Sequence, residues 1–331
     1  MSSSSIISLK LKKSLLQWYE KNQRPLPWRT THDPYKIWIS ETMLQQTTCA
    51  AVIPYYQRFL QAFPTVQELA RSPIEVVNQH WAGLGYYSRA RNLHKAAQQI
   101  AQLPKFPNTF EELILLPGFG PYTARAVASI AFNQPVGVLD GNVIRVLTRL
   151  GALDWQWWKP QIRTKLQQSA DQWVVQQCPA KINQALMELG ATICTPKNPA
   201  CLLCPIQSGC ISHRQHKPED FPTKKPKRSF EHWLLNFDIS KKKNRFAVTH
   251  NHYAPFLKGE LIFPGTAQQL KEKAKDFDFL HSITHHKIYV KLRVVEQQND
   301  QISWMNEAQL LKRVTSSLIK KTLRCLDKKC L

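Results

Sequence analysis

The sequence predicts a mostly helical body followed by a smaller α+β domain. Apolar residues recur at helical spacing through residues 8–194, a charged and Pro-rich segment follows at 213–229, and alternation typical of strands begins after it. A length of 331 residues fits two domains. We therefore expect a helical domain over 1–212, a linker over 213–229 and an α+β domain over 230–331.

The helical part is predicted from stretches such as "YKIWISETMLQQ" and "RNLHKAAQQIAQL", separated by Pro, Gly and Asn. The start, "MSSSSIISLKLKKSLLQWY", interleaves Lys with Leu and Ile, which favours an amphipathic helix over a signal peptide. No apolar run approaches the ~20 residues of a membrane span. We expect a cytoplasmic protein without a membrane partner and, in a reducing cytosol, without disulfides.

Strands are predicted in "HWLLNFDI", "RFAVTH", "GELIF" and "HHKIYVKLRVVE". In the last stretch apolar residues alternate with larger or charged ones: Ile288, Val290, Leu292 and Val294 against Tyr289, Lys291 and Arg293. This period of two predicts a strand with one face toward a core.

The charge balance points to a polyanionic partner. Lys and Arg number 45 against 23 acidic residues, a formal net charge of +22. The excess is spread over both predicted domains. Nucleic acid is the simplest partner for such a chain; the alternative is a soluble protein that is merely basic.

Four cysteines form a compact cluster in "CTPKNPACLLCPIQSGC", namely Cys194, Cys201, Cys204 and Cys210. A structural zinc site usually pairs two short C-x2–4-C turns, and only one gap here is short. An iron–sulfur cubane is larger, so the unequal gaps suit it. Zinc and unligated thiols remain the alternatives. The other cysteines lack this spacing and are interpreted as plain thiols: Cys49, Cys178, Cys325 and Cys330.

A glycine-rich turn precedes a predicted helix in "LPGFGPYTAR", residues 116–125. Without Cβ atoms, Gly118 and Gly120 allow the backbone to approach a ligand closely. The start of the next helix offers unpaired N–H groups and the positive end of its dipole. Together these features predict a phosphate site on one DNA strand, although such a turn by itself is often only a turn.

One carboxyl group is expected to be buried. In "ISETMLQQT", Glu41 shares a helix face with Ile37, Trp38, Leu44 and Gln45. Desolvation beside these side chains raises the pKa of a carboxyl group and keeps its proton near neutrality. Glu41 is therefore a candidate general acid; the alternative is a glutamate on a helix surface.

A second carboxyl group, Asp140 in "VLDGNVIRVL", stands just before a helix, where it is expected to be the N-cap. Backbone N–H bonds and the helix dipole should keep it ionised. An ionised carboxylate can stabilise an oxocarbenium-like sugar or trap it covalently. Glycoside hydrolysis uses one protonated and one charged carboxyl group in this way.

The cysteine spacing, the Gly-x-Gly turn and the Asp-Gly-Asn turn together resemble the helix-hairpin-helix glycosylases that carry a [4Fe-4S] cluster. Within that group the chain resembles the adenine DNA glycosylases of the MutY type, from about Leu15 to Cys210. The resemblance implies two helical subdomains with an iron–sulfur loop, a [4Fe-4S] cofactor on the four cysteines, and a C-terminal Nudix-like domain that inspects 8-oxoguanine.

The resemblance also implies chemical roles. Glu41, in the family's "SE-x-MLQQT" pattern, would protonate a ring nitrogen of adenine and then help to activate water. Asp140 would hold the cation at the anomeric carbon, with Asn142 nearby. Tyr122 would donate a hydrogen bond and form a wall near the sugar.

Further residues match the family's base pocket. "RPLPWR" resembles the adenine-pocket segment and would contribute Arg24, Leu26, Trp28 and Arg29; otherwise it is a Pro-rich turn around a buried Trp. Gln184 matches a residue that meets the adenine edge, and its alternative is a solvated helix glutamine.

Contacts with the opened duplex are implied as well, because a base must leave the stack to reach a cleft. Tyr86, helped by Leu84, would be the wedge, while Tyr87 is interpreted as a core aromatic. Gln46 and Thr47 would fill the opened stack.

The C-terminal domain departs from the family pattern. Of the Phe-Ser-His turn that reads the lesion, only "ITH" is present, leaving Thr284 and His285 as candidates. "FLKGELIFP" lacks the family's Trp and Gly-Gly. The Nudix pattern of spaced Gly and Glu is absent, so no pyrophosphohydrolase activity is expected.

The sequence is thus interpreted as a monomeric, monofunctional DNA glycosylase that removes adenine opposite 8-oxoguanine or guanine in duplex DNA. One alternative is an endonuclease III-like glycosylase and lyase for oxidised pyrimidines, which carries Lys where this chain has Tyr122. Another is a non-catalytic iron–sulfur DNA-binding protein, which the presence of both Glu41 and Asp140 disfavours.

Overall fold

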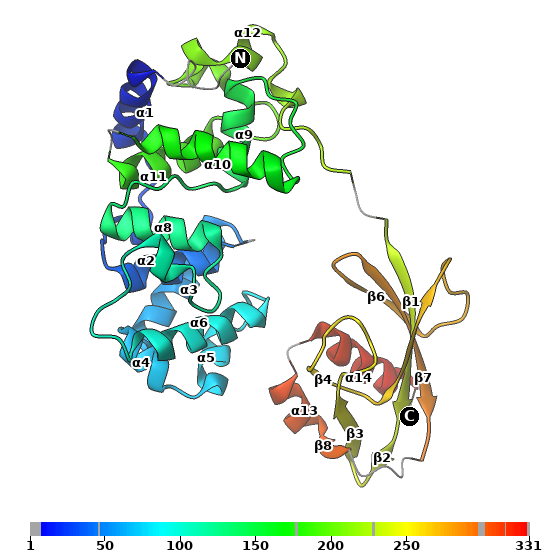
Figure 1. Ribbon diagram of the computed structural model, residues 1–331. Coiled ribbons are helices and arrows are strands. Elements are labelled where there is room, and N and C mark those ends of the chain that lie inside the picture. Colours follow the sequence, from blue (N-terminus) through cyan, green and yellow to red (C-terminus); the bar gives the residue numbers. More distant parts are fainter. Residues whose placement is uncertain are drawn as a thin grey trace. The chain divides into compact units, whose positions relative to one another are not determined.

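A computed structural model describes residues 8–45, 47–175, 178–226, 229–296, 302–314 and 316–329. The chain forms two compact units, Met1–Lys225 and Pro226–Leu331 (Figure 1). The division lies inside the segment 213–229. Its first part is held by the first unit, because Arg149 Nε donates to Phe221 O at 2.9 Å and Trp157 Nε1 donates to Thr223 O at 3.1 Å.

The first unit is helical, as predicted. Its α-helices are α1 (Leu9–Asn22), α2 (Pro34–Leu44), α3 (Cys49–Ala62), α4 (Val66–Arg71), α5 (Ile74–Trp81), α6 (Tyr87–Ile100), α7 (Phe110–Leu113), α8 (Pro121–Phe132), α9 (Gly141–Leu150), α10 (Pro160–Val174), α11 (Pro179–Thr192) and α12 (Ile211–Arg214). None of the described helices is long and apolar enough to cross a bilayer.

Two hydrophobic cores organise these helices into two lobes. One core surrounds Trp38 and Trp81 and is built mainly from α2 to α8. The other surrounds Leu15 and Trp173 and is built from α1 and α9 to α11. Figure 1 shows the same grouping, with α11 beside α8. The seam between the lobes is therefore where side chains of both can meet.

Local sequence fixes where the three helices at this seam begin. Asp33 caps α2 by accepting from Tyr35 N at 2.9 Å, and Pro34 occupies the first helical position. Gly120 is the N-cap of α8 and is again followed by a proline. Asp140 caps α9 through Val143 N at 2.7 Å. Each start therefore sets the direction of a helix that carries a site residue.

The second unit is α+β, also as predicted. Its strands are β1 (Glu231–Ile239), β2 (Lys241–Lys242), β3 (Arg245–His250), β4 (Leu261–Ile262), β5 (Gly265–Leu270), β6 (Phe279–Ile283), β7 (His286–Val294) and β8 (Ser303–Asn306), and its helices are α13 (Glu307–Arg313) and α14 (Ser317–Lys329). One sheet has the order β5-β1-β7-β6; the other runs β2-β3-β4, with β8 on β3. Strand β1 is parallel to β7 and antiparallel to β5.

The alternation predicted in β7 holds only in part. Ile288, Val290 and Leu292 are buried as expected, but Val294 at the strand end is 66% exposed. Tyr289, expected on the outer face, is buried, stacks on His232 and shares a 2.8 Å hydrogen bond with its Nδ1. The second face of the sheet is thus covered at Tyr289 by an aromatic side chain with a polar partner. An alternating pattern of apolar residues does not predict burial on both faces.

Candidate active site

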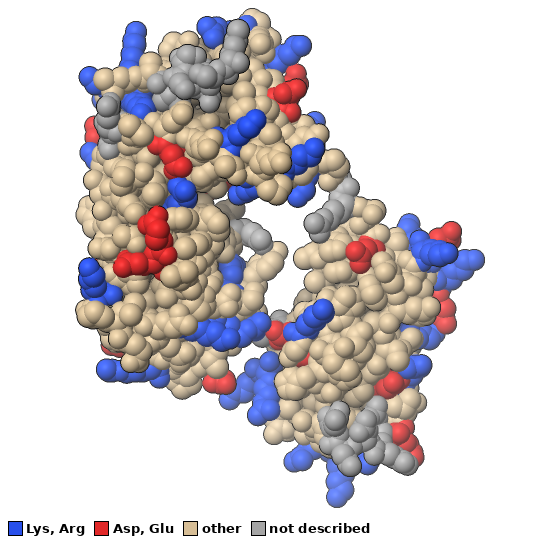
Figure 2. Space-filling view, viewed as in Figure 1, with Lys and Arg blue, Asp and Glu red and all other residues tan. Residues whose placement is uncertain are grey.

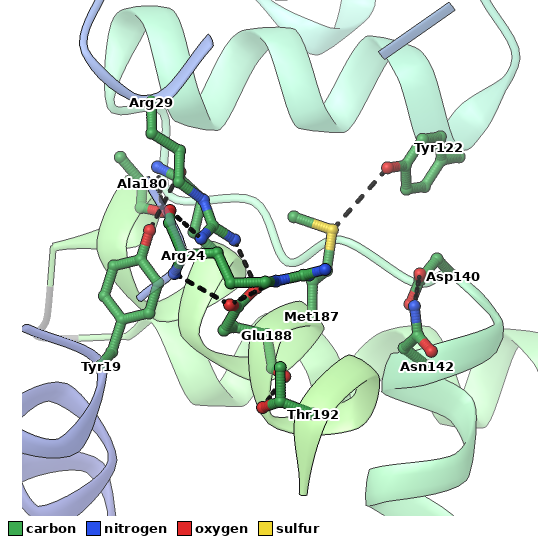
Figure 3. Close-up of polar contacts among 11 residues, drawn as sticks. Tyr19, Arg24, Arg29, Tyr122, Asp140, Asn142, Ala180, Met187, Glu188 and Thr192 are labelled. Atoms are coloured by element: carbon green, nitrogen blue, oxygen red, sulfur yellow. Dashed lines mark hydrogen bonds and ion pairs between the residues drawn. The ribbon is translucent and has the colours of Figure 1, made fainter. Parts of the chain in front are cut away.

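A pocket of about 170 Å³ lies between the two lobes of the first unit. From one lobe come Glu41 of α2 and Tyr122 of α8, and from the other come Asp140 and Asn142 at the start of α9 and Glu188 of α11. Residues far apart in the sequence thus converge on one cavity. Figure 3 shows Tyr122 and Asp140 on one side of this region, and Arg24, Arg29 and Glu188 on the other.

Glu41 is buried, as predicted, and is 5% exposed. Burial raises the pKa of its carboxyl group to about 7, the charge of Asp140 adds to this, and a hydrogen bond from Tyr122 opposes it. That bond, from Tyr122 Oη to Glu41 Oε2, is 2.5 Å long. A carboxyl group with this pKa retains a proton near neutrality and can give it up, which is what a general acid requires.

Asp140 is the predicted N-cap, but its electrostatics differ from the expectation. Val143 N donates to its Oδ1 at 2.7 Å and Asn142 Nδ2 donates to its Oδ2 at 2.9 Å. Burial nevertheless raises the pKa of Asp140, against the effect of these bonds and of Arg145. Sequence reasoning considered the cap and not the depth of the pocket. Asn142 is fixed in turn by Arg145 Nη2, which donates to Asn142 Oδ1 at 2.8 Å.

The far wall of the pocket is an ion-pair network. Arg24 donates to both oxygens of Glu188 at 2.8 Å, and Arg29 donates to Oε2 at 2.6 Å. Burial alone raises the pKa of Glu188, but the bonds from the two guanidinium groups lower it to about 2. Glu188 is therefore an anion, and it holds the "RPLPWR" segment in place.

The other predicted base-pocket residues also line this cavity. Leu26 and Trp28 are 6% and 7% exposed and contribute an apolar and an aromatic surface. Gln184 of α11 accepts from Tyr19 Oη through Oε1 at 3.1 Å. Its amide thus points into a hydrogen-bonded wall, not into solvent as its alternative interpretation assumed.

The Gly-x-Gly turn is open as predicted at Gly120, whereas Gly118 packs against Asn92. Gly118 has φ +81°, and a Cβ there would lie 2.8 Å from the Cβ of Asn92. Around Gly120 the space within 4 Å is open. The first turn of α8 therefore presents backbone N–H groups beside an uncovered backbone, an arrangement suited to an anion.

The wedge region is only partly as expected. Tyr86 is 57% exposed and its backbone is left-handed at φ 49°, so its ring projects from the turn before α6. Leu84 does not help it, because that side chain is 7% exposed and packs in the core. Thr47 lines the pocket. Gln46 lies outside the described residues.

The side chain of Arg89 joins the end of α2 to the turn before α6, and this connection was not predicted from the sequence. Its Nη1 donates to Thr42 O at 2.8 Å and to Gln45 O at 2.6 Å, at the end of α2. Its Nη2 donates to Leu84 O at 3.3 Å, and the guanidinium lies 5.5 Å from the Tyr86 ring centroid. Arg89 thus connects the helix of the acid to the turn of the wedge.

The four clustered cysteines surround one hollow in the second lobe. Among the described residues, no three of their sulfurs lie within 4.8 Å of one another. Four thiolates on a single zinc ion would be roughly 3.8 Å apart, given Zn–S bonds of ~2.3 Å. Four thiols around one hollow are a donor set that an iron–sulfur cluster takes in proteins. Arg149 Nη1 lies 3.4 Å from Cys194 Sγ and contributes positive charge beside the thiolates.

In the second unit, Thr284 and His285 form the turn between β6 and β7. Thr284 is left-handed at φ 54°, and its Oγ1 lies 3.3 Å from His285 Nδ1. His285 Nε2 lies 3.2 Å from Glu231 Oε1. The two candidates are therefore adjacent and partly exposed in the second unit.

Comparison with known proteins agrees with this geometry. Residues 39–172 match the HhH-GPD superfamily of base excision DNA repair proteins. An adenine DNA glycosylase from Buchnera aphidicola (subsp. Schizaphis graminum) is 34% identical over 83% of this chain and 84% of the relative. The chain belongs to the adenine DNA glycosylase family. The adenine DNA glycosylases of rat and human are 46% and 45% identical over 62% of the chain. The alignments span about two fifths of these mammalian proteins.

Solved structures show the same helical fold. A thermostable thymine-DNA glycosylase superposes with a TM-score of 0.57 at 26% identity, covering 62% of this chain and 95% of that protein. A trapped covalent complex of endonuclease III with DNA gives a TM-score of 0.53 at 23% identity, covering 65% and 99%. The predicted helix-hairpin-helix glycosylase fold is thus confirmed for this member of the adenine DNA glycosylase family.

Of this family member's pocket residues, sequence reasoning missed Glu188 and Met187. Glu188 lies four residues after Gln184 on α11, and helical spacing puts both on one face. That spacing was the available signal. Met187 Sδ lies 3.7 Å from Tyr122 Oη and completes the wall around the phenol.

Proposed function

We propose that this chain is a monofunctional DNA glycosylase that hydrolyses the N-glycosidic bond of deoxyadenosine opposite 8-oxoguanine or guanine in duplex DNA. One observation carries the proposal. The buried Glu41 receives a 2.5 Å hydrogen bond from a tyrosine, and Asp140 lines the same cavity. A proton donor and a candidate anion thus meet in a pocket that also holds an aromatic side chain and hydrogen-bonding amides.

The reaction uses the two carboxyl groups in sequence. Glu41 gives its proton to a ring nitrogen of adenine while the bond from the anomeric carbon to the base breaks. The electron pair of that N-glycosidic bond leaves with the base. The sugar becomes cationic, and the carboxylate of Asp140 stabilises it. Water then adds to the anomeric carbon and returns a proton to Glu41. The products are free adenine and an abasic site.

Tyr122 makes this enzyme hydrolytic. Burial, together with the nearby charges of Glu41 and Asp140, raises the pKa of the phenol well above its ordinary value, so its hydroxyl stays protonated. A phenol cannot form a Schiff base with the sugar. Strand cleavage by β-elimination, which needs an amine nucleophile, is therefore not part of the reaction.

Duplex binding follows from features of the same unit. The Gly118–Gly120 turn and the first turn of α8 suit a backbone phosphate, and Tyr86 suits insertion beside the extruded nucleotide. Lys and Arg side chains are spread over the visible faces of both units (Figure 2). Such a surface favours a polyanion without selecting a sequence. Duplex DNA containing the mispair is accordingly the proposed partner of a monomeric, cytoplasmic enzyme.

The four cysteines are proposed to hold a [4Fe-4S] cluster. The four cysteines line one hollow, and four thiols are the ligand set of such a cluster, which supports the proposal. Cys194, Cys201, Cys204 and Cys210 would hold the cluster as thiolates, and the segment between α11 and α12 would then be cross-linked. Elemental analysis should find about four irons per chain. A colourless protein with one tightly bound zinc at these cysteines would contradict the assignment.

Thr284 and His285 are proposed to read the lesion base. Both are partly exposed at the β6–β7 turn, where a hydroxyl and an imidazole offer donors and acceptors. In the double variant Thr284→Ala/His285→Ala, adenine release should persist while the preference for 8-oxoguanine over guanine weakens. An unchanged preference for 8-oxoguanine would show that this turn does not read the lesion base.

The decisive experiment is a nicking assay on duplexes with adenine opposite 8-oxoguanine. We expect an intact strand that breaks only after alkali treatment. In Tyr122→Lys a slow, borohydride-trappable adduct with DNA is expected, because an amine then replaces the phenol near the sugar. Efficient trapping and strand cleavage by the unmodified protein would instead favour the endonuclease III-like alternative.

A further inference from the structure

Three potential metal ligands meet at the β6–β7 turn of the second unit, whereas the cysteine loop belongs to the first unit. They are Glu231 at the start of β1, His285 in the turn and His286 at the start of β7. One ligand atom of each lies within 4.8 Å of those of the other two. Among the described residues, one group of three or more histidine, cysteine or acidic side chains is close enough to share an ion, and it is this one.

The backbone fixes this arrangement. Strands β1 and β7 are parallel and Glu231 is paired with His286, while Glu231 N donates to His285 O at 2.9 Å. The left-handed turn residue Thr284 then sends the chain from β6 into β7. All three side chains thus leave a hydrogen-bonded frame that exists before any ion arrives, which lowers the cost of assembling the site.

The distances match ligands around a metal ion. His285 Nε2 lies 3.2 Å from Glu231 Oε1, and His286 Nε2 lies 3.4 Å from Oε2. Charge-assisted N–H···O bonds are usually ~2.7–2.9 Å. With Zn–N and Zn–O bonds of ~2.0–2.2 Å, the edges of a tetrahedron are roughly 3.3–3.5 Å. Each imidazole thus faces a different oxygen of the Glu231 carboxylate, at a separation that is long for an ion pair and of the size of a ligand–ligand distance on one ion. A carboxylate that binds the ion through both oxygens would use both contacts.

Neighbouring groups orient two of the three ligands. Thr284 Oγ1 donates its proton to Ile283 O at 2.7 Å, so its lone pairs face His285 Nδ1 at 3.3 Å. When an ion replaces the proton on Nε2, a proton on Nδ1 can be donated to Thr284 Oγ1, and the Nε2 lone pair then faces the ion beside Glu231. Trp233 Nε1 donates to Glu231 Oε2 at 3.1 Å. Such outer hydrogen bonds are typical of ligating imidazoles and carboxylates.

The third ligand is positioned by packing. The ring of His286 contacts the rings of Trp233 and Phe256, with centroids 6.4 and 5.6 Å away, and its Nδ1 is buried with no partner among the described residues. The side chains of His285 and Glu231 are 30% and 36% exposed, so an ion has a path from solvent. A fourth coordination position remains for water.

We propose that Glu231, His285 and His286 bind one divalent first-row transition-metal ion, with zinc as the probe. Two imidazoles and a carboxylate are the donor set that such ions take in proteins. The ion would hold the β6–β7 turn to β1. The site involves neither the pocket of the first unit nor the cysteine loop. It shares His285 with the turn that is proposed to read the lesion base, so zinc binding, and not the lesion preference, is the readout of its test.

The test uses the full chain with its iron retained, stripped of loosely bound metal and titrated with ZnCl2 by calorimetry. One zinc per chain is expected. Glu231→Gln and His286→Gln should each weaken binding tenfold or more, since loss of an outer hydrogen bond alone weakens such sites 10–100-fold. His250→Gln, which alters an exposed histidine of β3, should bind as the unmodified protein does. Equal binding by all variants would overturn the proposal.

X-ray absorption at the zinc edge keeps the test valid even if a variant misfolds, because it uses the unmodified chain. Two imidazoles with oxygen ligands and no sulfur are expected. Sulfur ligands would place the ion at the cysteine loop and overturn the proposal, as would a failure to retain zinc. Iron content, measured in the same samples, should be unchanged by zinc.

Discussion

Two carboxyl groups at opposite walls of the pocket are buried to a similar degree and behave in opposite ways. Glu41 is 5% exposed and Glu188 is 1% exposed. The pKa of Glu41 is raised to about 7, whereas that of Glu188 is lowered to about 2. Glu41 meets a single phenol, while Glu188 meets two guanidinium groups. Burial therefore raises the pKa of both carboxyl groups, and the neighbouring side chains determine whether the final pKa lies above or below the ordinary value.

The sharpest test of this contrast removes the proton of Glu41. Glu41→Gln should lower adenine release by a factor of about 10³ or more, because the amide keeps the shape and cannot protonate the base. Duplex binding should persist in a gel-shift assay. Glu75→Gln, a change on the exposed face of α5, should leave the rate unchanged. Full activity in Glu41→Gln would assign the acid role to another residue.

Removing the negative charge of Glu188, at the opposite wall of the pocket, should mainly lower the stability of the first unit. Glu188→Gln leaves two guanidinium groups without their anion, and we expect a loss of about 3 kcal/mol in the free energy of unfolding of the first unit. The midpoint of urea denaturation measures it. Glu20→Gln is the matched control, because Glu20 and Lys181 form an exposed pair whose loss should change little. Equal midpoints in the two variants would refute an anchoring role for Glu188.

The rate should also depend on pH through Glu41. Since the protonated form is required, adenine release should fall as pH rises through about 7, by about tenfold per unit beyond it. The stability of the folded state should change with pH in the same direction as the rate. The folded state holds this proton where the unfolded state has lost it, so stability from this group declines between about 4.5 and 7. A single-turnover rate that stays flat from pH 6 to 9 would contradict the assignment.

The smallest effect concerns the phenol. The hydrogen bond from Tyr122 lowers the pKa of Glu41, so Tyr122→Phe should raise that pKa further. The alkaline limb of the rate profile should then move to higher pH by a fraction of a unit. Tyr35→Phe is the control, because its hydroxyl donates to Phe63 O, a backbone oxygen outside the pocket lining. A shift in the opposite direction would mean that Tyr122 does not act on the ionised acid.

Part of the site could be predicted from local sequence because its cause is local. Helical spacing placed Ile37 and Trp38 beside Glu41, and both are 1% exposed. An aspartate before a helix predicted the cap of α9. The Gly-x-Gly pattern predicted an open backbone, which is found at Gly120. In each case the determining neighbours lie within four residues along the chain, where spacing alone is informative.

What was missed depends on contacts across the fold. Glu188 is 164 residues from Arg24. Tyr122 and Glu41 are 81 residues apart, and only the family resemblance indicated that they are close. No periodicity reports such pairs. Leu84 was assigned to the DNA surface, whereas the packing of the lobe buries it. In the second unit, β5 (Gly265–Leu270) was not predicted, because an edge strand of polar residues with little burial shows no apolar alternation.

Arg89 couples the end of α2 to the turn that presents Tyr86. Its guanidinium is hydrogen-bonded to backbone oxygens on both sides, at the last turn of the acid's helix and at the turn that presents Tyr86. A strand that pushes the turn aside must either break those bonds or drag the end of α2 with it. In the proposed complex with DNA, this side chain would therefore couple a movement of the Tyr86 turn to a movement of the helix that carries Glu41.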